Sequence, residues 1–493
     1  MNHSLKISLA QLESHLWEAA NILRGPVDAS DFKTYIFPLL FFKRISDVYD
    51  EERATAVAEY GQDFPENHRF QIPAAAHWQD IRAVAQNIGI ALQNAFRDIE
   101  AANQEQLHNI FGDAQWSNKQ RLSDALLTDL IEHFSALPLS NSAIEPDMLG
   151  QAYEYLIKKF ADATNKKAGE FYTPRSVVQL MMDILDPQPG ETIYDPACGT
   201  GGMLLAAINH VRQQGGRIET LLGKLYGQEK NLTTASIARI NLFLHGVEDF
   251  HIVRGDTLRN PAFHSGDQLQ QFDIVIANPP FSLEQWGWEV WEKDRYQRNI
   301  AGLPSNKNGD FAWVQHMVAS MKPGNGRMAV VLPHGVLFRM GKEGEIRHKL
   351  LEMDLLDAVI GLGPNLFYGT GLAACILIFS RQTRHPGQVL LVDASTLYQS
   401  GRNQNSLEPQ HVQQILAWVQ AYEDAPGHAK VVALNEIAAN DWNLNIPRYV
   451  EPLIEEETIT VAEALDNLRQ SLDEAYAAED KLKMLLQKSE LIE

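Results

Sequence analysis

The tetrapeptide Asn278-Pro279-Pro280-Phe281 carries the groups that a loop acting on an aromatic amine would need. Such an amine, for example that of adenine, is a poor nucleophile because its lone pair is delocalised into the ring. The side-chain carbonyl of Asn278 and the backbone carbonyl of Pro279 could accept its two hydrogens and localise the lone pair toward an electrophile. Phe281 would offer a ring face for the base to stack on. A Pro-Pro pair alone suits an ordinary loop equally well.

The elements around this tetrapeptide favour the chemical interpretation. Residues 272–277 form an apolar run typical of a buried parallel strand, and open α/β sheets place their active-site loops at the carboxyl ends of such strands. Residues 191–202 follow the pattern of a strand, a glycine-rich turn and a helix start, which would present helix N-terminal amides to a ligand. The turn departs from the dinucleotide fingerprint, since Leu204 replaces its third glycine. Roughly three strand-helix units separate the two motifs, as expected of two sites on one sheet.

Together, Asp195 to Gly202 and Asn278 to Phe281 resemble the cofactor-binding and amino-methylation motifs of N6-adenine DNA methyltransferases, which use S-adenosyl-L-methionine (AdoMet). Residues 168–175 resemble the segment that closes over AdoMet in enzymes with this motif order. Residues 9–50 are similar to the N-terminal helical domain of the modification subunit of type I restriction-modification systems. The resemblance covers nearly the whole chain. It implies the α/β fold of AdoMet-dependent methyltransferases, a mostly parallel doubly wound sheet, with an N-terminal helical domain and a C-terminal helical tail.

The resemblance and the position of each residue along the chain give a set of candidate site residues. Glu229 ends the second predicted strand, where a carboxylate can accept both ribose hydroxyls of AdoMet. The resemblance places Asp256 near the adenine amine of the cofactor, although Asp-Thr is also an ordinary helix cap. Asp195 is predicted to shape the glycine turn or to meet the amino group of the methionine part. The predicted cofactor-binding residues are Glu170, Phe171, Tyr172, Thr173, Pro174, Arg175, Asp195, Gly199, Thr200, Gly201, Gly202, Glu229 and Asp256, and the predicted catalytic residues are Asn278, Pro279, Pro280 and Phe281.

The predicted reaction is methyl transfer from AdoMet to the N6 amine of adenine. One adenine of double-stranded DNA would be rotated out of the stack into a pocket beside Phe281, because its amine cannot reach the donor from inside the duplex. Transfer would be a single displacement driven by proximity and orientation, with no covalent intermediate and no protein general base. Asn-Pro-Pro-aromatic motifs also serve the methylation of RNA, of protein glutamine and of cytosine N4. A non-catalytic assembly scaffold with a decayed site is a further alternative.

The charge of the chain bears on its partners. A formal net charge of −21 argues against self-sufficient DNA binding, which needs a basic surface. Most of the chain after Phe281 is predicted to complete the sheet, and little of it remains for a domain that recognises bases. The strand patterns in this part lie at residues 328–332, 355–362, 373–379 and 389–393. We therefore predict a separate DNA-specificity subunit, which the resemblance also implies. A second copy of this chain and a restriction (nuclease/translocase) subunit are the other expected partners.

Three further segments have two interpretations each. Trp286, Trp288 and Trp291 could stack on an unpaired base, but the favoured interpretation is that they pin a lid in place. His316 and His334 lie in apolar surroundings and are better interpreted as packed histidines than as bases. The tail from residue 459 repeats apolar residues at steps of three and four, which favours docking to a partner helix over packing on its own domain.

Composition and pattern divide the chain into a helical docking domain (1–145), a catalytic domain (146–450) and a coiled-coil-like tail (451–493). With 45% hydrophobic residues, disorder is excluded as the main state. Neither the two cysteines, Cys198 and Cys375, nor the 16 histidines have metal-ligand spacing, so no metal site is predicted. No apolar run reaches the ~20 residues that cross a bilayer, and a signal-peptide pattern is absent. The expected location is the cytoplasm.

Overall fold

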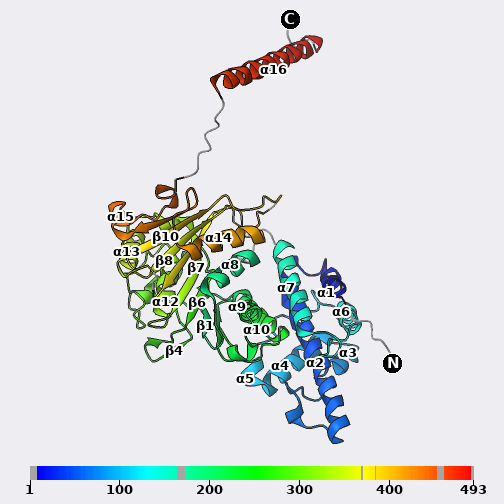
Figure 1. Ribbon diagram of the computed structural model, residues 1–493. Helices are drawn as coiled ribbons and strands as arrows, with labels where there is room; N and C mark the ends of the chain where they lie inside the picture. Colours follow the sequence, from blue (N-terminus) through cyan, green and yellow to red (C-terminus); the bar gives the residue numbers. More distant parts are fainter. Residues whose placement is uncertain are drawn as a thin grey trace. The chain divides into compact units, whose positions relative to one another are not determined.

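The computed structural model describes residues 8–163, 173–367, 370–382, 385–402, 404–451 and 460–489. The chain falls into two compact units, one up to Val450 and one from Glu451 onward (Figure 1). The first unit begins with the helices α1 (Leu9–Leu23), α2 (Phe32–Tyr60), α3 (Trp78–Arg82), α4 (Ile88–Ala102), α5 (Gln104–Leu107), α6 (Asp124–Ser135) and α7 (Pro146–Ala163).

These N-terminal helices share one aromatic-rich core. A capping box between Ser8 and Gln11 starts α1, and the middle of α2 is buried almost all round. The core extends into α10 (Leu232–Leu244), where the ring centroid of Phe243 lies 5.9 Å from that of Phe41. The helix α10 directly follows β2 (Leu225–Glu229), the second strand of the sheet. The N-terminal helices therefore pack on a helix that belongs to the sheet region.

The remaining part of the first unit is built on a nine-stranded sheet with the order β11-β10-β8-β9-β7-β6-β1-β2-β3. Five of its strand pairings are parallel; β9 runs antiparallel to β7 and β8, and β11 runs antiparallel to β10. The strands of this sheet are β1 (Ile193–Asp195), β2 (Leu225–Glu229), β3 (His251–Arg254), β6 (Ile274–Ala277), β7 (Arg327–Pro333), β8 (Leu356–Leu362), β9 (Ala374–Ser380), β10 (Gln388–Ala394) and β11 (Ala429–Ala433). The short strands β4 (His264–Ser265) and β5 (Gln268–Leu269) form a separate hairpin.

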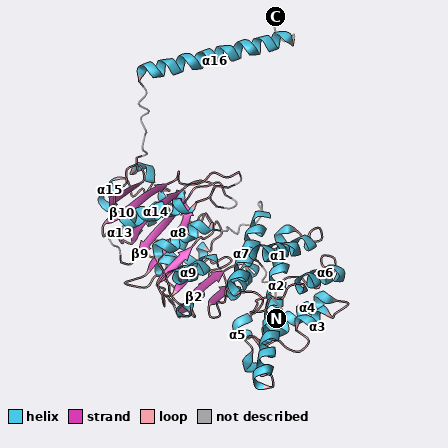
Figure 2. Cartoon of the chain, turned by 45° about the vertical axis from the view of Figure 1, so that its right-hand side comes forward, coloured by secondary structure: helices cyan, strands magenta, loops and turns pink. Residues whose placement is uncertain are grey.

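Helices cover both faces of the sheet (Figure 2). One face packs on α8 (Arg175–Leu185), α9 (Gly202–Gln213) and α14 (Pro409–Ala421). The other packs on α12 (Asp310–Ala319), α13 (Lys342–Glu352) and α15 (Leu434–Ala439). Burial on both faces explains why the central strands are continuous apolar runs, as the pattern of residues 272–277 predicted. A mostly parallel, doubly wound α/β sheet is therefore confirmed.

The order of the strands reverses between β1 and β6. From β1 the chain builds outward through β2 to β3, and β6 then returns to the other side of β1. The two strands are parallel, with Ile193 beside Ile274 and Tyr194 beside Val275. Their carboxyl ends therefore lie side by side, at the kind of switch point where open α/β sheets bind ligands. The loops that start after Asp195 and after Ala277 leave the sheet from this one edge.

The second unit contains the helix α16 (Val461–Lys488), which begins with a capping box between Thr460 and Glu463. Its apolar stripe is exposed, with Leu468 at 55% and Leu472 at 43%. Among the helices of the described residues, none combines the length and the apolar character that a bilayer span requires.

Candidate functional site

The glycine turn after β1 leaves its backbone open to a ligand. Gly199 and Gly201 have φ of +52° and +79°, in the left-handed region that favours glycine. A Cβ added at Gly199 or Gly202 would meet no atom within 4 Å. The turn is fixed from behind, where the buried side chain of Asn241 donates to the carbonyl of Thr200 at 3.0 Å. The first amides of α9 are thus presented at an open surface, which suits a polar ligand.

Two acidic side chains border this turn. Asp195 is buried and its Oδ1 accepts from the amide of Ala197 at 3.0 Å. Glu229, at the end of β2, accepts from the amides of Gly199 at 3.1 Å and of Asn231 at 2.7 Å. Burial raises the pKa of Asp195 to about 8, and the nearby Glu229 carboxyl acts in the same direction, against the Ala197 hydrogen bond. A positively charged group beside Asp195 would restore its ionised form.

The loop after β3 packs against the glycine turn. Thr257 donates its hydroxyl hydrogen to the carbonyl of Pro196 at 2.6 Å, and both residues are buried. Asp256 accepts from the amide of Arg259 at 3.2 Å, and its Oδ2 lies 2.9 Å from the Nζ atom of Lys230. Asp256 therefore does cap a turn, which was the alternative interpretation of Asp-Thr, and it lies beside the loop after β1.

The two polar atoms of the Asn278 side-chain amide differ in their hydrogen bonding. Its Nδ2 donates to the hydroxyl oxygen of Thr173 at 2.9 Å, a contact that joins the start of α8 to the loop after β6. Its Oδ1 is buried and has no hydrogen-bond partner among the residues that the structure describes. A buried carbonyl without a donor is unfavourable by about 1–3 kcal/mol. A hydrogen bond from a ligand to this oxygen would remove that unfavourable contribution.

The rest of the tetrapeptide is supported from behind. Pro279 is buried, and the half-buried ring of Phe281 meets Phe367 edge to face at 6.1 Å between centroids. Ser282 has a φ of +50°, and its amide donates to Oδ1 of the fully buried Asp310 at 2.7 Å.

Arg339 completes this support, because its Nη1 donates to Oδ2 of Asp310 at 2.9 Å. Sequence reasoning did not identify Asp310 or Arg339. Neither residue belongs to a motif, and the contact joins the first residue of α12 to a loop beyond β7.

The segment expected to close over the cofactor is only partly described. Pro174 stands at the N-cap position of α8, and the exposed Arg175 forms an ion pair with Glu154 on α7. The predicted residues Glu170, Phe171 and Tyr172 lie outside the described residues. The structure thus brings Thr173, the glycine turn, Glu229 and Asn278 to one edge of the sheet.

Comparison with known protein families identifies the type of protein. A model of the N-6 DNA methylase family matches residues 144–458, which is more than half of the chain. The chain belongs to the N-6 DNA methylase family. A second model, of the HsdM N-terminal domain, matches residues 12–134.

Similarity to individual relatives shows which class of N-6 DNA methylase this chain belongs to. The chain is 34% identical to the methylase subunit of the type I restriction enzyme MjaVII from Methanocaldococcus jannaschii, over 73% of this chain and 61% of that protein. It is 30% identical to the HindI methylase subunit from Haemophilus influenzae, over 85% of this chain and 98% of that protein. The crystal structure of a type I methyltransferase subunit from Streptococcus thermophilus superposes with a TM-score of 0.78 at 32% identity, covering 90% of this chain and 100% of that one. This N-6 DNA methylase is therefore of the type I class.

The reaction of the family is methyl transfer from AdoMet to the N6 amine of adenine in DNA, and this chain is an enzyme of that kind. The predictions of family, fold, cofactor and adenine-specific DNA methylation are confirmed. The matches support adenine in DNA over RNA, protein glutamine or cytosine, and over a non-catalytic scaffold. The MjaVII and HindI relatives are each named as the methylase subunit of a type I restriction enzyme, that is, as one part of a larger complex.

The described residues of this N-6 DNA methylase fit AdoMet in two respects. The open backbone at Gly199 and Gly202 allows close approach of a ligand to the N-terminus of α9. Among the residues that the structure describes, no cation forms an ion pair with the buried carboxyl group of Asp195, and AdoMet carries positive charge on its ammonium and sulfur groups.

The tryptophans after the acceptor loop are packed against the protein. Trp286 and Trp291 are 1% and 0% exposed, and their indole Nε1 atoms donate to the carbonyls of Ser305 and Leu258. Neither ring can stack on a base in this arrangement, which supports the interpretation that they pin a segment in place. His316 is likewise packed, at 1% exposed, and this burial holds its pKa well below its usual value.

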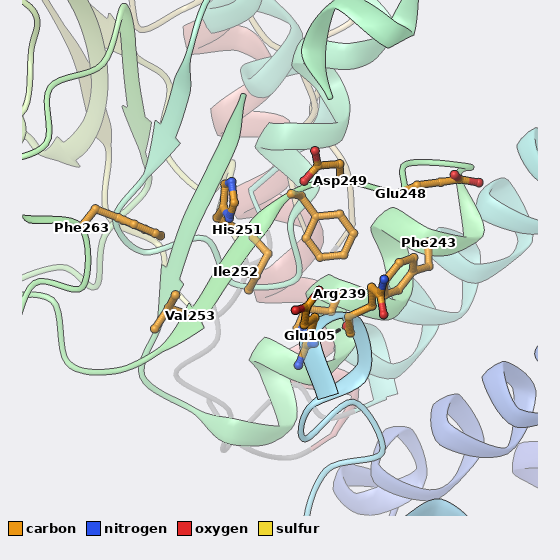
Figure 3. Close-up of a pocket in the computed structure, with 11 residues that line it drawn as sticks. Glu105, Arg239, Phe243, Glu248, Asp249, His251, Ile252, Val253 and Phe263 are labelled. Carbon is orange, nitrogen blue, oxygen red and sulfur yellow. Dashed lines mark hydrogen bonds between the residues drawn. The ribbon is translucent and has the colours of Figure 1, made fainter. Parts of the chain in front are cut away.

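A cavity of about 540 Å³ lies elsewhere in this N-6 DNA methylase, between α5, α10 and β3 (Figure 3). Arg239 and Phe243 of α10 and His251 of β3 line it. None of the described residues of the glycine turn or of the tetrapeptide does so. The cavity is therefore separate from the candidate active site.

Proposed function

We propose that this chain methylates adenine N6 with an acceptor loop, residues 278–281, that faces a donor turn, residues 195–202. The observation that carries this proposal is the buried, unpaired Oδ1 of Asn278 at the switch point of the sheet. An amide oxygen in this position can accept an amine hydrogen from adenine. The hydrogen bond from Nδ2 to Thr173 supports the role, because it orients Oδ1, and not Nδ2, toward the incoming amine.

On the acceptor side, Oδ1 of Asn278 and the backbone carbonyl of Pro279 would accept the two amine hydrogens. Pro279 and Pro280 would restrict the loop, and Phe281 would stack on the base. The adenine would be rotated out of the DNA helix to reach this loop. The amine becomes acidic only once it is methylated, so its proton can leave to water and no general base is assigned.

On the donor side, the backbone of Gly199, Thr200, Gly201 and Gly202 would hold the cofactor against the N-terminus of α9. AdoMet supplies a methyl group on a positively charged sulfur when it is bound. We assign Asp195 to the ammonium group of its methionine part, because the buried carboxyl group regains its charge beside a cation.

Two further acids would hold the adenosine part of the cofactor. Glu229 would accept the ribose hydroxyls, and the amides of Gly199 and Asn231 fix its position. Asp256 would meet the adenine amine while it keeps its capping role. Residues 170–175, which include Glu170, Phe171, Tyr172, Thr173, Pro174 and Arg175, would form the cover of this site.

The arrangement of the complex is also a proposal. A separate specificity subunit would read the target sequence, because the net charge of −21 does not favour DNA binding by this chain alone. The boundaries 1–145, 146–450 and 451–493 would separate the docking domain, the catalytic domain and the tail. A second copy of the chain and a restriction subunit would complete the assembly. Two free cysteines suit the reducing cytoplasm.

Product mapping tests the proposed reaction. The chain is purified with the specificity subunit of its native host and incubated with host DNA and labelled AdoMet. We expect the label in N6-methyladenine, at a single sequence context, and only when the specificity subunit is present. Label in cytosine, RNA or protein would overturn the proposal, and so would sequence-specific transfer by the chain alone.

A further inference from the structure

The segment between residues 283 and 309 leaves the acceptor loop and returns to it. The amide of Gly309 donates to the carbonyl of Leu283 at 3.0 Å, which closes the segment at its base. Asp310, which follows Gly309, accepts a hydrogen bond from the amide of Ser282, and Ser282 is the residue after Phe281. The segment is therefore closed at its base, directly beside the acceptor loop.

Arg298 is the buried centre of this segment. Its side chain is 0% exposed and that of its partner Asp294 is 1% exposed. Nη2 and Nε of Arg298 donate to the Asp294 carboxylate at 2.8 and 3.1 Å, and its guanidinium lies 4.3 Å from the centroid of the Trp291 ring. A buried ion pair is a weak source of stability, because desolvation opposes the Coulombic attraction. A contribution to stability therefore does not by itself explain why Arg298 and Asp294 are buried here.

The other donors of Arg298 reach the loop after β3. Nη1 donates to the carbonyl of Thr257 at 3.1 Å, and Nη2 donates to that of Leu258 at 2.9 Å. The indole Nε1 of Trp291 donates to the same Leu258 carbonyl at 2.7 Å. Thr257 in turn donates to Pro196, the residue after Asp195.

We propose that Arg298 is a positioning residue that fixes the cofactor side of the site relative to the acceptor loop. This inference rests on the proposed function, in which Asp256 and Asp195 hold AdoMet and residues 278–281 hold adenine. A planar guanidinium can bond to two adjacent carbonyls and a carboxylate at once, so it links the loop after β3, through Thr257 and Leu258, to Asp294 of its own segment. Displacement of this loop would loosen the cofactor and misalign the methyl group with the amine, since an error of about 1 Å can lower a rate ~100-fold.

The principal test replaces Arg298 by lysine. Arg298→Lys keeps a cation for Asp294 but cannot reach both loop carbonyls. The matched control is Arg295→Lys, three residues away, where the side chain is 56% exposed, bonds to Tyr296 and lies 3.8 Å from the exposed carboxylate of Asp267, and where lysine can keep that ion pair. In the complex with the specificity subunit, two quantities are measured. They are the dissociation constant of AdoMet without DNA and the single-turnover transfer rate at saturating AdoMet, each per AdoMet-binding site.

We expect Arg298→Lys to weaken AdoMet binding about fivefold and to slow transfer about tenfold or more, in line with ~1 kcal/mol for each lost hydrogen bond. Arg295→Lys should match the wild type in both. A purely structural Arg298 would lower the melting temperature and the fraction of active sites, but not the values per site, and that outcome overturns the inference.

A milder variant serves if Arg298→Lys does not fold. Trp291→Phe keeps an aromatic ring beneath the guanidinium, removes the donor to Leu258 and shortens a fully buried side chain that packs against Trp286. It should change both quantities in the same direction by about two- to fivefold, and wild-type values would overturn the inference. Failure of the proposed function is distinguishable, because the wild-type complex would then form no N6-methyladenine at all.

Discussion

The hydrogen bond between Thr173 and Asn278 gives a sharp prediction about the acceptor loop. The Thr173 hydroxyl oxygen accepts from Asn278 Nδ2 at 2.9 Å, and this bond decides which end of the amide faces adenine. Thr173→Val keeps the branched shape of the side chain but removes the acceptor. Thr173→Ser keeps the hydroxyl group and is the matched control.

The expected size of the effect follows from this single bond. A neutral hydrogen bond contributes about 1 kcal/mol, which corresponds to about a fivefold change in rate. If the freed amide turns over and presents Nδ2 to the amine, the acceptor is lost altogether. The loss can then approach the ~100-fold seen when one transition-state hydrogen bond is deleted. We therefore expect Thr173→Val to slow transfer between about 5-fold and 100-fold, with AdoMet affinity within about twofold of the wild type.

The assay is single-turnover methyl transfer to a target duplex at saturating AdoMet, with AdoMet affinity measured separately by calorimetry. Thr173→Ser should transfer at nearly the wild-type rate. A wild-type rate in Thr173→Val would refute the orienting role, and so would equal losses in the valine and serine variants. If Thr173 instead contacts the cofactor, the valine variant would bind AdoMet more weakly and transfer normally at saturation.

Two other predictions concern the donor turn and the tail. Because the pKa of Asp195 is raised to about 8, this carboxyl group is mostly protonated at pH 7 and must ionise to meet a cation. AdoMet binding at pH 7 should therefore release close to one proton, measured by calorimetry in buffers of different ionisation enthalpy. Affinity should rise as pH increases from 6 to 8, and Asp195→Asn should show neither effect; wild-type proton release in that variant would contradict the assignment. In the tail, Leu468→Asp with Leu472→Asp should abolish co-purification with the specificity subunit and leave AdoMet affinity unchanged, whereas Gln470→Ala should retain the partner. A lower melting temperature of the isolated double variant would instead indicate packing on its own domain.

The elements that hold the two loops could be predicted because their signals are local. The apolar run at residues 272–277 contains β6, and the strand patterns after it correspond to β7, β8, β9 and β10. Strands buried on both faces are continuously apolar, which makes them visible in a sequence. The antiparallel direction of β9 has no such signal, because apolar content does not encode strand direction.

The residues that hold the site from behind could not be predicted, because their contacts join parts of the chain that are far apart in the sequence. Asp310 reaches Ser282 across 28 residues, and Arg298 reaches Thr257 across 41. In the sequence, Arg298 belongs to a polar run and gives no sign of complete burial. Burial of a charged side chain becomes evident only when its hydrogen-bond partners are placed around it.

Replacement of Asn278 by alanine tests the central claim most directly. Transfer to a target duplex is measured in a single turnover, and AdoMet affinity is measured on the same complex. Asn209→Ala, on the exposed side of α9, is the control. We predict a loss of transfer of at least about 100-fold in Asn278→Ala, because a hydrogen bond to the reacting amine is removed. AdoMet affinity should stay within about twofold, because the donor turn is intact. Equal loss of transfer and of AdoMet binding would contradict the division of the site into an acceptor loop and a donor turn, and full retention of transfer would exclude Asn278 from the reaction.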